Sequence, residues 1–436
     1  MNLFAIDTEE AEVLSGWTLP CFVYRLDLAR ERWRSLRAAL PAAVRIAYAV
    51  KSNPHPALVS SFAELGADFD TASIGELELL SKIPHSGGLL FAGPGKTRAE
   101  LDRALELGAR IEIDGPEDIA AIEALLSARP ELGPRGEKLA LSIRVHPARD
   151  RCYPRYAGSS KEMGAGFSER NAIIGGTSAS AFGVDEEDLE DFLKEAARAR
   201  HIKIAGLQVF ASSNEKDAES LLASHRAALE IGRELEGLSG TELDLIDLGG
   251  GLGIPYSEAE HELDIRALGS GLKELLAENS WFAGRLLVEP GRWLSGPCGV
   301  YMAHVVRVKK SRGTDFTVLE GGINHLLRPL LTGQPFPVCA LRPGQGEIGG
   351  PLFRQVLAGP LCSSLDRLGT VLLPELKAGD IVLFGQAGAY GFSESMSLFL
   401  SHPQAAEYAL DGPPQSGKEP LSLHGSAGYS KEHELH

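Results

Sequence analysis

Short apolar runs alternate with helical patterns eight times between residues 44 and 290, and this alternation constrains the fold more than any other feature of the chain. In the intervening segments, such as 218–237, apolar residues recur at helical spacing. Eight successive strand and helix pairs predict an α/β fold, a (β/α)₈ barrel of the TIM type. The expected strands are 44–51, 67–70, 89–92, 110–113, 139–145, 203–210, 243–249 and 285–290.

The pattern changes at about residue 295 to short strand-like stretches broken by Gly and Pro, which is typical of an all-β domain; the stretches are 299–311, 315–322, 335–341 and 379–385. The last residues are rich in Gly, Pro, Ser and charge. The expected divisions are a barrel over 25–294, a C-terminal all-β domain over 295–410 that is joined by residues 1–24, and a flexible tail over 411–436. The segment 147–183 is long for a connection, and either an ordered active-site loop or a disordered lid would fit it.

The bulk composition excludes several classes of partner. A net charge of −16 argues against general affinity for nucleic acid or anionic membrane. The N-terminus is acidic where a signal peptide would be basic, and no apolar run reaches membrane-spanning length, so we expect a cytoplasmic protein. Five cysteines without a CxxC pair indicate reduced thiols and no metal site. They are Cys21, Cys152, Cys298, Cys339 and Cys362.

Polar and glycine residues cluster where the expected strands end. In a barrel of this type the C-terminal strand ends form the active face, so these residues should converge. They are Lys51, Asp70, Gly93, Asp114, His146, Ser212, Ser213, 249–253 and Glu289.

Three of these features suggest chemistry, although each has a structural alternative. Lys51 follows an apolar strand, and a desolvated lysine there can attack an aldehyde. The alternative is a solvated lysine at a strand end, without a catalytic role. The glycine-rich run 247–253 could hold the phosphate of pyridoxal 5′-phosphate (PLP), or it could be a plain turn. Glu289 could pair with a pyridine nitrogen, or form an ion pair at a turn with Arg292. Cys362 and Tyr390 could equally serve packing and a tight turn.

Taken in order, the motifs of the chain resemble those of the fold-type III PLP-dependent decarboxylases, the family of diaminopimelate, ornithine and arginine decarboxylases. The resemblance spans roughly residues 20–410. The motifs that carry it are YAVKSN (48–53), GADFDTASIGEL (66–77), SAFGV (180–184), DLGGGLG (247–253), VEPGR (288–292), GPLCSSLD (359–366) and GAYG (388–391).

The resemblance implies roles for individual residues. Lys51 would hold PLP as a Schiff base, and Glu289 would pair with the pyridinium nitrogen. Cys362 would reach in from a partner subunit and return a proton to the substrate carbanion, so a homodimer with shared active sites is implied. The resemblance further assigns Asp70, Phe210, Ser213, Gly250, Gly251, Gly253, Arg292 and Tyr390 to the cofactor, and Arg328, Ser363 and Asp366 to the substrate.

Two positions depart from the family pattern. Phe210 stands where the family has a histidine stacked on the PLP ring, and a phenyl ring cannot carry a proton. Ser363 stands where diaminopimelate and ornithine decarboxylases have an acid that binds the distal amine of the substrate. A serine cannot make a charge-assisted bond to an ammonium, so lysine, ornithine and diaminopimelate should be poor substrates.

The C-terminal stretches 321–338, 359–366 and 399–403 are similar to the branch of the family found in secondary metabolism and exopolysaccharide clusters. That branch includes the butirosin-pathway decarboxylase of glutamate tethered to an acyl carrier protein. The resulting hypothesis is a PLP-dependent decarboxylase of an amino acid, or a carrier-bound amino-acyl group, without a distal amine. The alternatives are a diaminopimelate- or ornithine-type decarboxylase of a free amino acid, a PLP-dependent racemase and a non-catalytic PLP-binding homologue.

Overall fold

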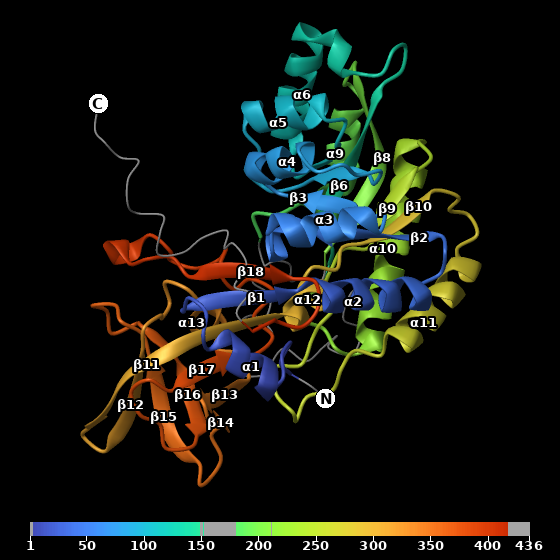
Figure 1. The fold of residues 1–436 in the computed structure, drawn as a ribbon. Coiled ribbons are helices and arrows are strands. Elements are labelled where there is room, and N and C mark those ends of the chain that lie inside the picture. Colours follow the sequence, from blue (N-terminus) through green and yellow to red (C-terminus); the bar gives the residue numbers. More distant parts are fainter. Residues whose placement is uncertain (1–2, 149–150, 152–179, 211, 417–436) are drawn as a thin grey trace, which may run out of the picture. The chain divides into compact units, whose positions relative to one another are not determined.

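The structure is a computed structural model that describes residues 3–148, 151, 180–210 and 212–416 (Figure 1). The chain divides into two compact units. Unit 1 comprises Met1–Arg32, Pro255–His261 and Arg292–His436, and unit 2 comprises Trp33–Ile254 and Glu262–Gly291.

Unit 2 contains a closed barrel of eight parallel strands, which confirms the predicted fold class. The strands pair in the order β5-β4-β3-β2-β10-β9-β8-β6, and pairing of β5 with β6 closes the ring. A two-residue strand, β7 (Val184–Asp185), adds to the edge of β6. The barrel strands are β2 (Val44–Ala49), β3 (Asp68–Thr71), β4 (Leu89–Phe91), β5 (Arg110–Ile113), β6 (Leu139–His146), β8 (Ile202–Val209), β9 (Leu245–Asp247) and β10 (Arg285–Val288).

Helices follow the barrel strands, and several begin at a side chain that caps the first turn. Ser73 accepts a hydrogen bond from the N–H of Glu76, and Thr97 forms a reciprocal capping box with Glu100. These caps fix where each strand-to-helix loop ends. Helix α2 (Leu26–Ala39) precedes the first barrel strand. The helices that follow are α3 (Pro56–Glu64), α4 (Ile74–Ser81), α5 (Arg98–Glu106), α6 (Pro116–Ala128), α9 (Leu189–Ala196), α10 (Ala218–Ser239) and α11 (Ile265–Glu278).

The interior of the barrel holds an apolar layer formed by Ala47, Leu90, Leu245 and Leu287. These residues come from β2, β4, β9 and β10, so the layer joins strands that are distant in sequence. Packed side chains of this kind fill the barrel and leave its C-terminal strand ends to carry polar groups.

Unit 1 contains a nine-stranded sheet in the order β14-β13-β17-β11-β12-β15-β16, with β1 paired to both β11 and β18. The expected strands over 299–311, 315–322, 335–341 and 379–385 correspond to β11, β12, β13 and β17, whereas β14, β15, β16 and β18 were not predicted. The strands are β1 (Cys21–Arg25), β11 (Gly299–Ser311), β12 (Thr314–Leu319), β13 (Val338–Arg342), β14 (Gly346–Glu347), β15 (Phe353–Ala358), β16 (Arg367–Leu373), β17 (Ile381–Phe384) and β18 (Ala406–Leu410).

The N-terminal segment completes the core of unit 1. Leu14 of α1 (Thr8–Leu14) and Trp17 pack with buried residues of β1, β11 and β18, and the ring centroids of Trp17 and Tyr408 lie 5.0 Å apart. Two further short helices, α12 (Arg292–Ser295) and α13 (Arg328–Thr332), carry arginines of interest for function.

Several expectations fall on residues outside the described ranges. Most of the segment 147–183, Cys152 and residues 417–436 are among them, so the loop and tail expectations stay predictions. Among the described residues, Cys21, Cys298, Cys339 and Cys362 are free thiols. No helix in the described part of the chain is long and apolar enough to cross a membrane.

Candidate active site

Lys51 lies at the mouth of the barrel, on a short 3₁₀ turn (Val50–Ser52) directly after β2. Its Nζ lies 2.8 Å from Oδ2 of Asp70, which stands beside Ala49 in the pairing of β2 with β3. The lysine side chain is 31% exposed and the aspartate 1%. An amine that reaches solvent above a buried carboxylate is oriented by that carboxylate and remains accessible to a small molecule.

Glu76 is a member of this group that the sequence reasoning did not single out. It lies in the first turn of α4 and accepts a hydrogen bond from the N–H of Ala72 at 2.7 Å. Burial raises the pKa of Glu76 to about 7, and the neighbouring charge of Asp70 adds to the effect while Lys51 opposes it. The signal was present in the motif GADFDTASIGEL, where Glu76 occupies the third helical position after the Ser73 cap.

The glycine-rich segment after β9 forms a cradle that only glycine can line. A Cβ on Gly250 would lie 2.7 Å from the carbonyl oxygen of Glu289, and one on Gly251 would lie 2.7 Å from that of Ser212. Gly251 also has a φ of +95°, which L side chains rarely adopt. Three backbone segments approach closely here, and because the glycines carry no Cβ, a group that binds backbone N–H, such as a phosphate, can be accommodated.

Gly253 has a different part in this cradle from the one expected. Its N–H donates to the carbonyl oxygen of Glu215 at 2.7 Å, and the N–H of Glu215 donates to Gly251 at 2.8 Å. The N–H of Ile254 donates to Oδ1 of Asn214 at 2.9 Å. Because its N–H is already used, Gly253 joins the loops after β8 and β9 and is not a phosphate donor. The loop that carries Ser213 is thereby fixed beside the cradle.

Three buried carboxyls converge inside the barrel: Glu112 of β5, Asp247 of β9 and Glu289 directly after β10. One carboxylate oxygen from each of the three residues lies within 4.8 Å of the corresponding oxygens of the other two. Gln208 of β8 donates from Nε2 to Oε2 of Glu289 at 3.4 Å. Burial raises the pKa of Glu289 to about 7, with a further contribution from the charge of Asp70.

Of these residues only Glu289 was predicted as a site residue. The available signal for the others was a polar side chain inside an otherwise apolar strand, as in RIEI (110–113) and LDLIDLG (243–249). A strand with one buried polar position is compatible with either a surface or an interior location, so the sequence alone could not bring Glu112 and Asp247 together.

Phe210 borders the same cradle. A Cβ on Gly250 would lie 3.3 Å from Cε2 of its ring, and the guanidinium of Arg144 lies 5.9 Å from the ring centroid. The same guanidinium lies 4.6 Å from the ring centroid of Phe182, in the motif SAFGV. Phe210 therefore places an aromatic face beside the glycines, at the position expected from the family pattern.

The described residues fit PLP, as judged by the cradle, the lysine and the carboxyls. The glycines leave space for a phosphate, Lys51 can reach an aldehyde, and Glu289 has an oxygen, Oε1, without a hydrogen-bond partner among the described residues. A buried, unpaired carboxylate oxygen is costly unless a donor such as a pyridinium nitrogen satisfies it.

In unit 1 the predicted residues Arg292, Arg328 and Tyr390 form one cluster. The guanidinium of Arg328 lies 4.2 Å from the Tyr390 ring centroid and that of Arg292 lies 4.9 Å away. Arg292 also donates to the Tyr256 hydroxyl at 2.7 Å, and Nη1 of Arg328 lies 2.9 Å from both oxygens of Glu394. Tyr256 and Glu394 were not predicted.

Cys362 is exposed in unit 1, on a loop held by Asp366. Asp366 is only 3% exposed, and its two oxygens accept hydrogen bonds from the N–H groups of Ile323 at 2.8 Å and Leu361 at 2.7 Å. These two hydrogen bonds give Asp366 a positioning role in the loop, and its contact with the substrate stays a prediction. Ser363 lies beside the cysteine on this loop.

Comparison with known proteins agrees with this geometry. The family described as "Pyridoxal-dependent decarboxylase, pyridoxal binding domain" matches residues 26–296. The chain belongs to this family. It is a PLP-dependent amino-acid decarboxylase, a carboxy-lyase, as the motifs predicted.

Its relatives include decarboxylases of different substrates. The chain is 29% identical over 418 residues to the L-glutamyl-[BtrI acyl-carrier protein] decarboxylase of Niallia circulans, covering 92% of each chain. It is 30% identical to the diaminopimelate decarboxylase of Zymomonas mobilis, covering 92% of this chain and 90% of that one. Among solved structures, diaminopimelate decarboxylase from Helicobacter pylori complexed with L-lysine matches with a TM-score of 0.77 at 25% identity, covering 92% and 93% of the two chains.

Proposed function

We propose that this decarboxylase removes the α-carboxylate of an amino acid or amino-acyl group that lacks a distal amine, with a carrier-protein-bound amino acid as its preferred substrate. The observation that carries the proposal is Ser363, an uncharged residue beside Cys362. Two acids lie on nearby segments, but Asp366 is held by two backbone N–H groups and Glu394 by Arg328. Both acids are thus already engaged within the chain, and neither stands at the position of the family's amine-binding acid.

The residues of the barrel mouth have complementary tasks in this proposal. Lys51 is the nucleophile that anchors the cofactor, and Asp70 orients its amine. Glu289 would hold a proton at the ring nitrogen through its unpaired oxygen, and Phe210, which borders the glycine cradle, would help to hold the ring and exclude water. When bound, PLP supplies the electron sink that makes loss of CO₂ from Cα possible.

The proton that replaces CO₂ at Cα is assigned to the Sγ–H of Cys362. The loop of Cys362 is exposed in the single chain, and its position is fixed by Asp366. Proton delivery from a positioned side chain typically contributes about 10²–10⁴-fold to a rate. Phe210 cannot share this task because a phenyl ring has no exchangeable proton.

The proposed active unit is a homodimer in which Cys362 serves the barrel of the partner. Support comes from large apolar side chains of unit 1 that are exposed in the single chain. Large apolar side chains that are exposed in this number are expected at interaction sites. The residues lie on α13, on the Cys362 loop, on β16 and just before β18: Leu330, Leu331, Leu365, Leu372, Met396, Leu398, Phe399 and Leu400.

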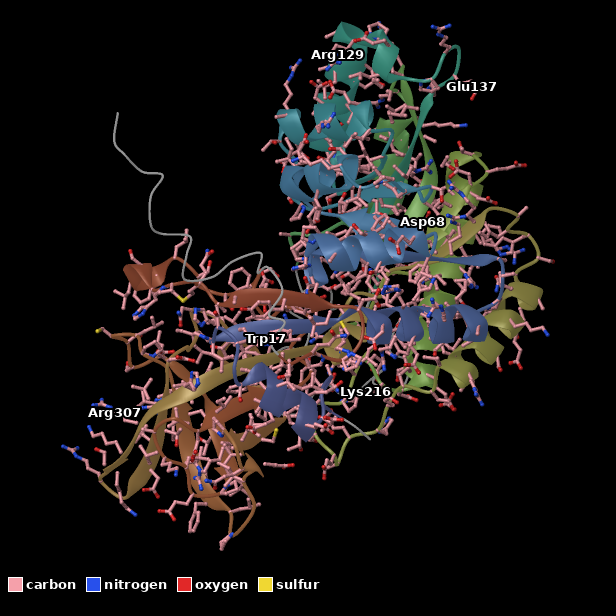
Figure 2. All side chains as sticks on the ribbon, in the orientation of Figure 1. Trp17, Asp68, Arg129, Glu137, Lys216 and Arg307 are labelled. Atoms are coloured by element: carbon pink, nitrogen blue, oxygen red, sulfur yellow. The ribbon has the colours of Figure 1, made fainter. Side chains whose placement is uncertain are left out.

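A carrier-bound substrate also requires a surface for the carrier, and one exposed face of the β11, β12, β15 and β16 sheet is suited to an acidic partner. Strand register places Arg307, Lys309 and Arg354 on this face, and Arg307 is marked in Figure 2. Asp315 is the one acid in these four strands, and it points to the opposite face, where it pairs with Lys310. Against a net charge of −16, such a face can steer an acidic protein.

The test compares release of CO₂ from matched substrates. Free glutamate, its pantetheine thioester and glutamyl-loaded BtrI acyl-carrier protein are assayed beside lysine, ornithine and diaminopimelate. We expect the carrier-bound form to have the highest kcat/KM, and its KM to rise with salt while that of the thioester does not. Efficient turnover of any of the three diamines would contradict the proposal and favour the diaminopimelate-type function that several relatives have. Product that keeps its carboxylate would instead indicate a racemase.

A further inference from the structure

Glu112 is a buried carboxyl with no part in the mechanism above. It lies inside β5, opposite Ser142 of β6, and is 0% exposed. Neither of its carboxyl oxygens has a hydrogen-bond partner among the described residues. A buried side chain with two unsatisfied oxygens is rare in a folded protein and calls for an explanation.

The other two carboxyls of the cluster are better supported than Glu112. Asp247 accepts at Oδ1 from the N–H of Gly249 at 2.8 Å, and it lies within hydrogen-bonding reach of Glu289. Glu289 accepts from Gln208. Gln208 is itself only 3% exposed, and its Oε1 has no partner in the described part of the chain. This unused acceptor indicates that the cluster contains a hydrogen-bond donor.

The charges that face the cluster cannot neutralise three anions. Among the described residues, Lys51, Arg144 and Arg110 act on the cluster, and Lys51 is already paired with Asp70. Two further ion pairs surround Glu112 and are complete in themselves, Arg110 with Asp244 and Lys96 with Asp114. Like charges this close in a buried setting cannot all be ionised, so protons or a bound cation must be present.

We propose that Glu112 is a neutral carboxylic acid at physiological pH and a positioning residue, whose O–H donates into the Asp247 and Glu289 pair and keeps Glu289 as the anion that faces the cofactor ring. This rests on the role proposed for Glu289. Burial raises the pKa of Glu112 well above its usual range, and the charges of Glu289 and Asp70 raise it further. Asp247 is affected in the same direction, again chiefly by burial.

A neutral Glu112 has a consequence for stability that does not depend on turnover. A carboxyl that stays protonated in the fold but ionises in the unfolded chain contributes stability that is full below its unfolded pKa and is lost as pH rises toward its folded pKa. Glu112→Gln keeps the size and a donor but cannot ionise. The Tm of this variant should therefore rise relative to that of the wild type as the pH increases from 5 to 8.

The experiment measures Tm against pH for the cofactor-free wild type, Glu112→Gln and the control Glu64→Gln, an exposed glutamate of the same unit. Infrared spectra in ²H₂O test for the C=O band of a protonated carboxylic acid, which Glu112→Gln should lose and Glu64→Gln should keep. Glu112→Met, which has no ionisable group and no donor, should weaken PLP binding about tenfold, while Glu112→Gln should bind as the wild type does.

Three results would overturn the proposal. A Tm difference between Glu112→Gln and the wild type that does not change with pH would mean that Glu112 does not hold a proton in the fold. Equal PLP affinity in the Gln and Met variants would reduce Glu112 to a space-filling role. A stoichiometric metal in the purified wild type that is lost in Glu112→Gln would show that the three carboxyls bind a cation. If the Gln variant does not fold, the Met variant serves for the infrared and pH measurements. All the stability and infrared readouts stand even if the proposed substrate is wrong.

Discussion

The barrel mouth and the Cys362 loop of unit 1 both contain a buried aspartate, but their hydrogen bonding differs. Asp366 uses both oxygens on backbone N–H groups, whereas Asp247 uses Oδ1 and leaves Oδ2 without a partner among the described residues. Unsatisfied oxygens recur at Glu112 and Glu289 in the barrel. A satisfied network holds a loop in one shape, and an unsatisfied one is stable only if a ligand or proton completes it.

The largest expected effect tests whether the barrel mouth is the chemical centre. Lys51→Ala should lose the visible cofactor absorbance and reduce CO₂ release to background, because it removes the amine that Asp70 orients at the barrel mouth. Absorbance spectra and a CO₂ assay measure this. The matched control is Lys82→Ala, an exposed lysine of the same unit. Normal turnover without Lys51 would refute the assignment of the site.

The next largest effect tests the Cys362 loop, where both oxygens of Asp366 have hydrogen-bond partners. Asp366→Ala should lower the free energy of unfolding by about 3 kcal/mol, because it leaves two buried backbone N–H groups without an acceptor. Urea unfolding measures this change. Asp315→Ala removes an exposed acid whose pair with Lys310 is 3.6 Å long, and it should cost less than about 1 kcal/mol. Similar values for both variants would mean that Asp366 does not hold the loop.

Removal of the thiol of Cys362 separates proton delivery from cofactor binding. Cys362→Ala should keep PLP bound but slow product formation by about 10²-fold, with protonation at the wrong carbon in a fraction of turnovers. Product analysis and cofactor absorbance together measure this. Cys339→Ala, at a thiol in the same unit whose pKa burial raises to about 12, is the control. An unchanged rate in the Cys362 variant would remove that residue from the mechanism.

The last effect tests whether a buried acid that has a hydrogen-bond partner also makes the stability of the protein depend on pH. Glu407 of β18 accepts from the Tyr24 hydroxyl at 2.7 Å, and burial raises its pKa to about 7. Since this value lies above that of the unfolded chain, the wild type should lose stability as pH rises from about 4.5 to 7, by about 1.4 kcal/mol for each pH unit. Glu407→Gln should remove this loss in pH-dependent urea unfolding. A variant with the same pH profile as the wild type would place the titration elsewhere.

The sequence predicted the barrel well because the signals it uses are local. Eight apolar runs of strand length, separated by amphipathic segments, correspond to the eight barrel strands. The capping residues and the polar strand ends are local as well, and Lys51 and Asp70 meet as this pattern predicts. The β domain was predicted less completely, since β18 is placed by pairing with β1, almost four hundred residues away in the chain.

What only the tertiary structure decided is where hydrogen bonds and charges meet across distant segments. Ordered motifs by themselves identified the family and the departures at Phe210 and Ser363, and they predicted Lys51 as the cofactor lysine. They could not show that the N–H of Gly253 is taken by Glu215, that Asp366 holds a loop, or that Glu112 faces Asp247 and Glu289. The physical reason is that closing a barrel sets the stagger of its strands, and the stagger selects which interior side chains share a layer. That selection is a property of the closed ring and cannot be read from any one strand.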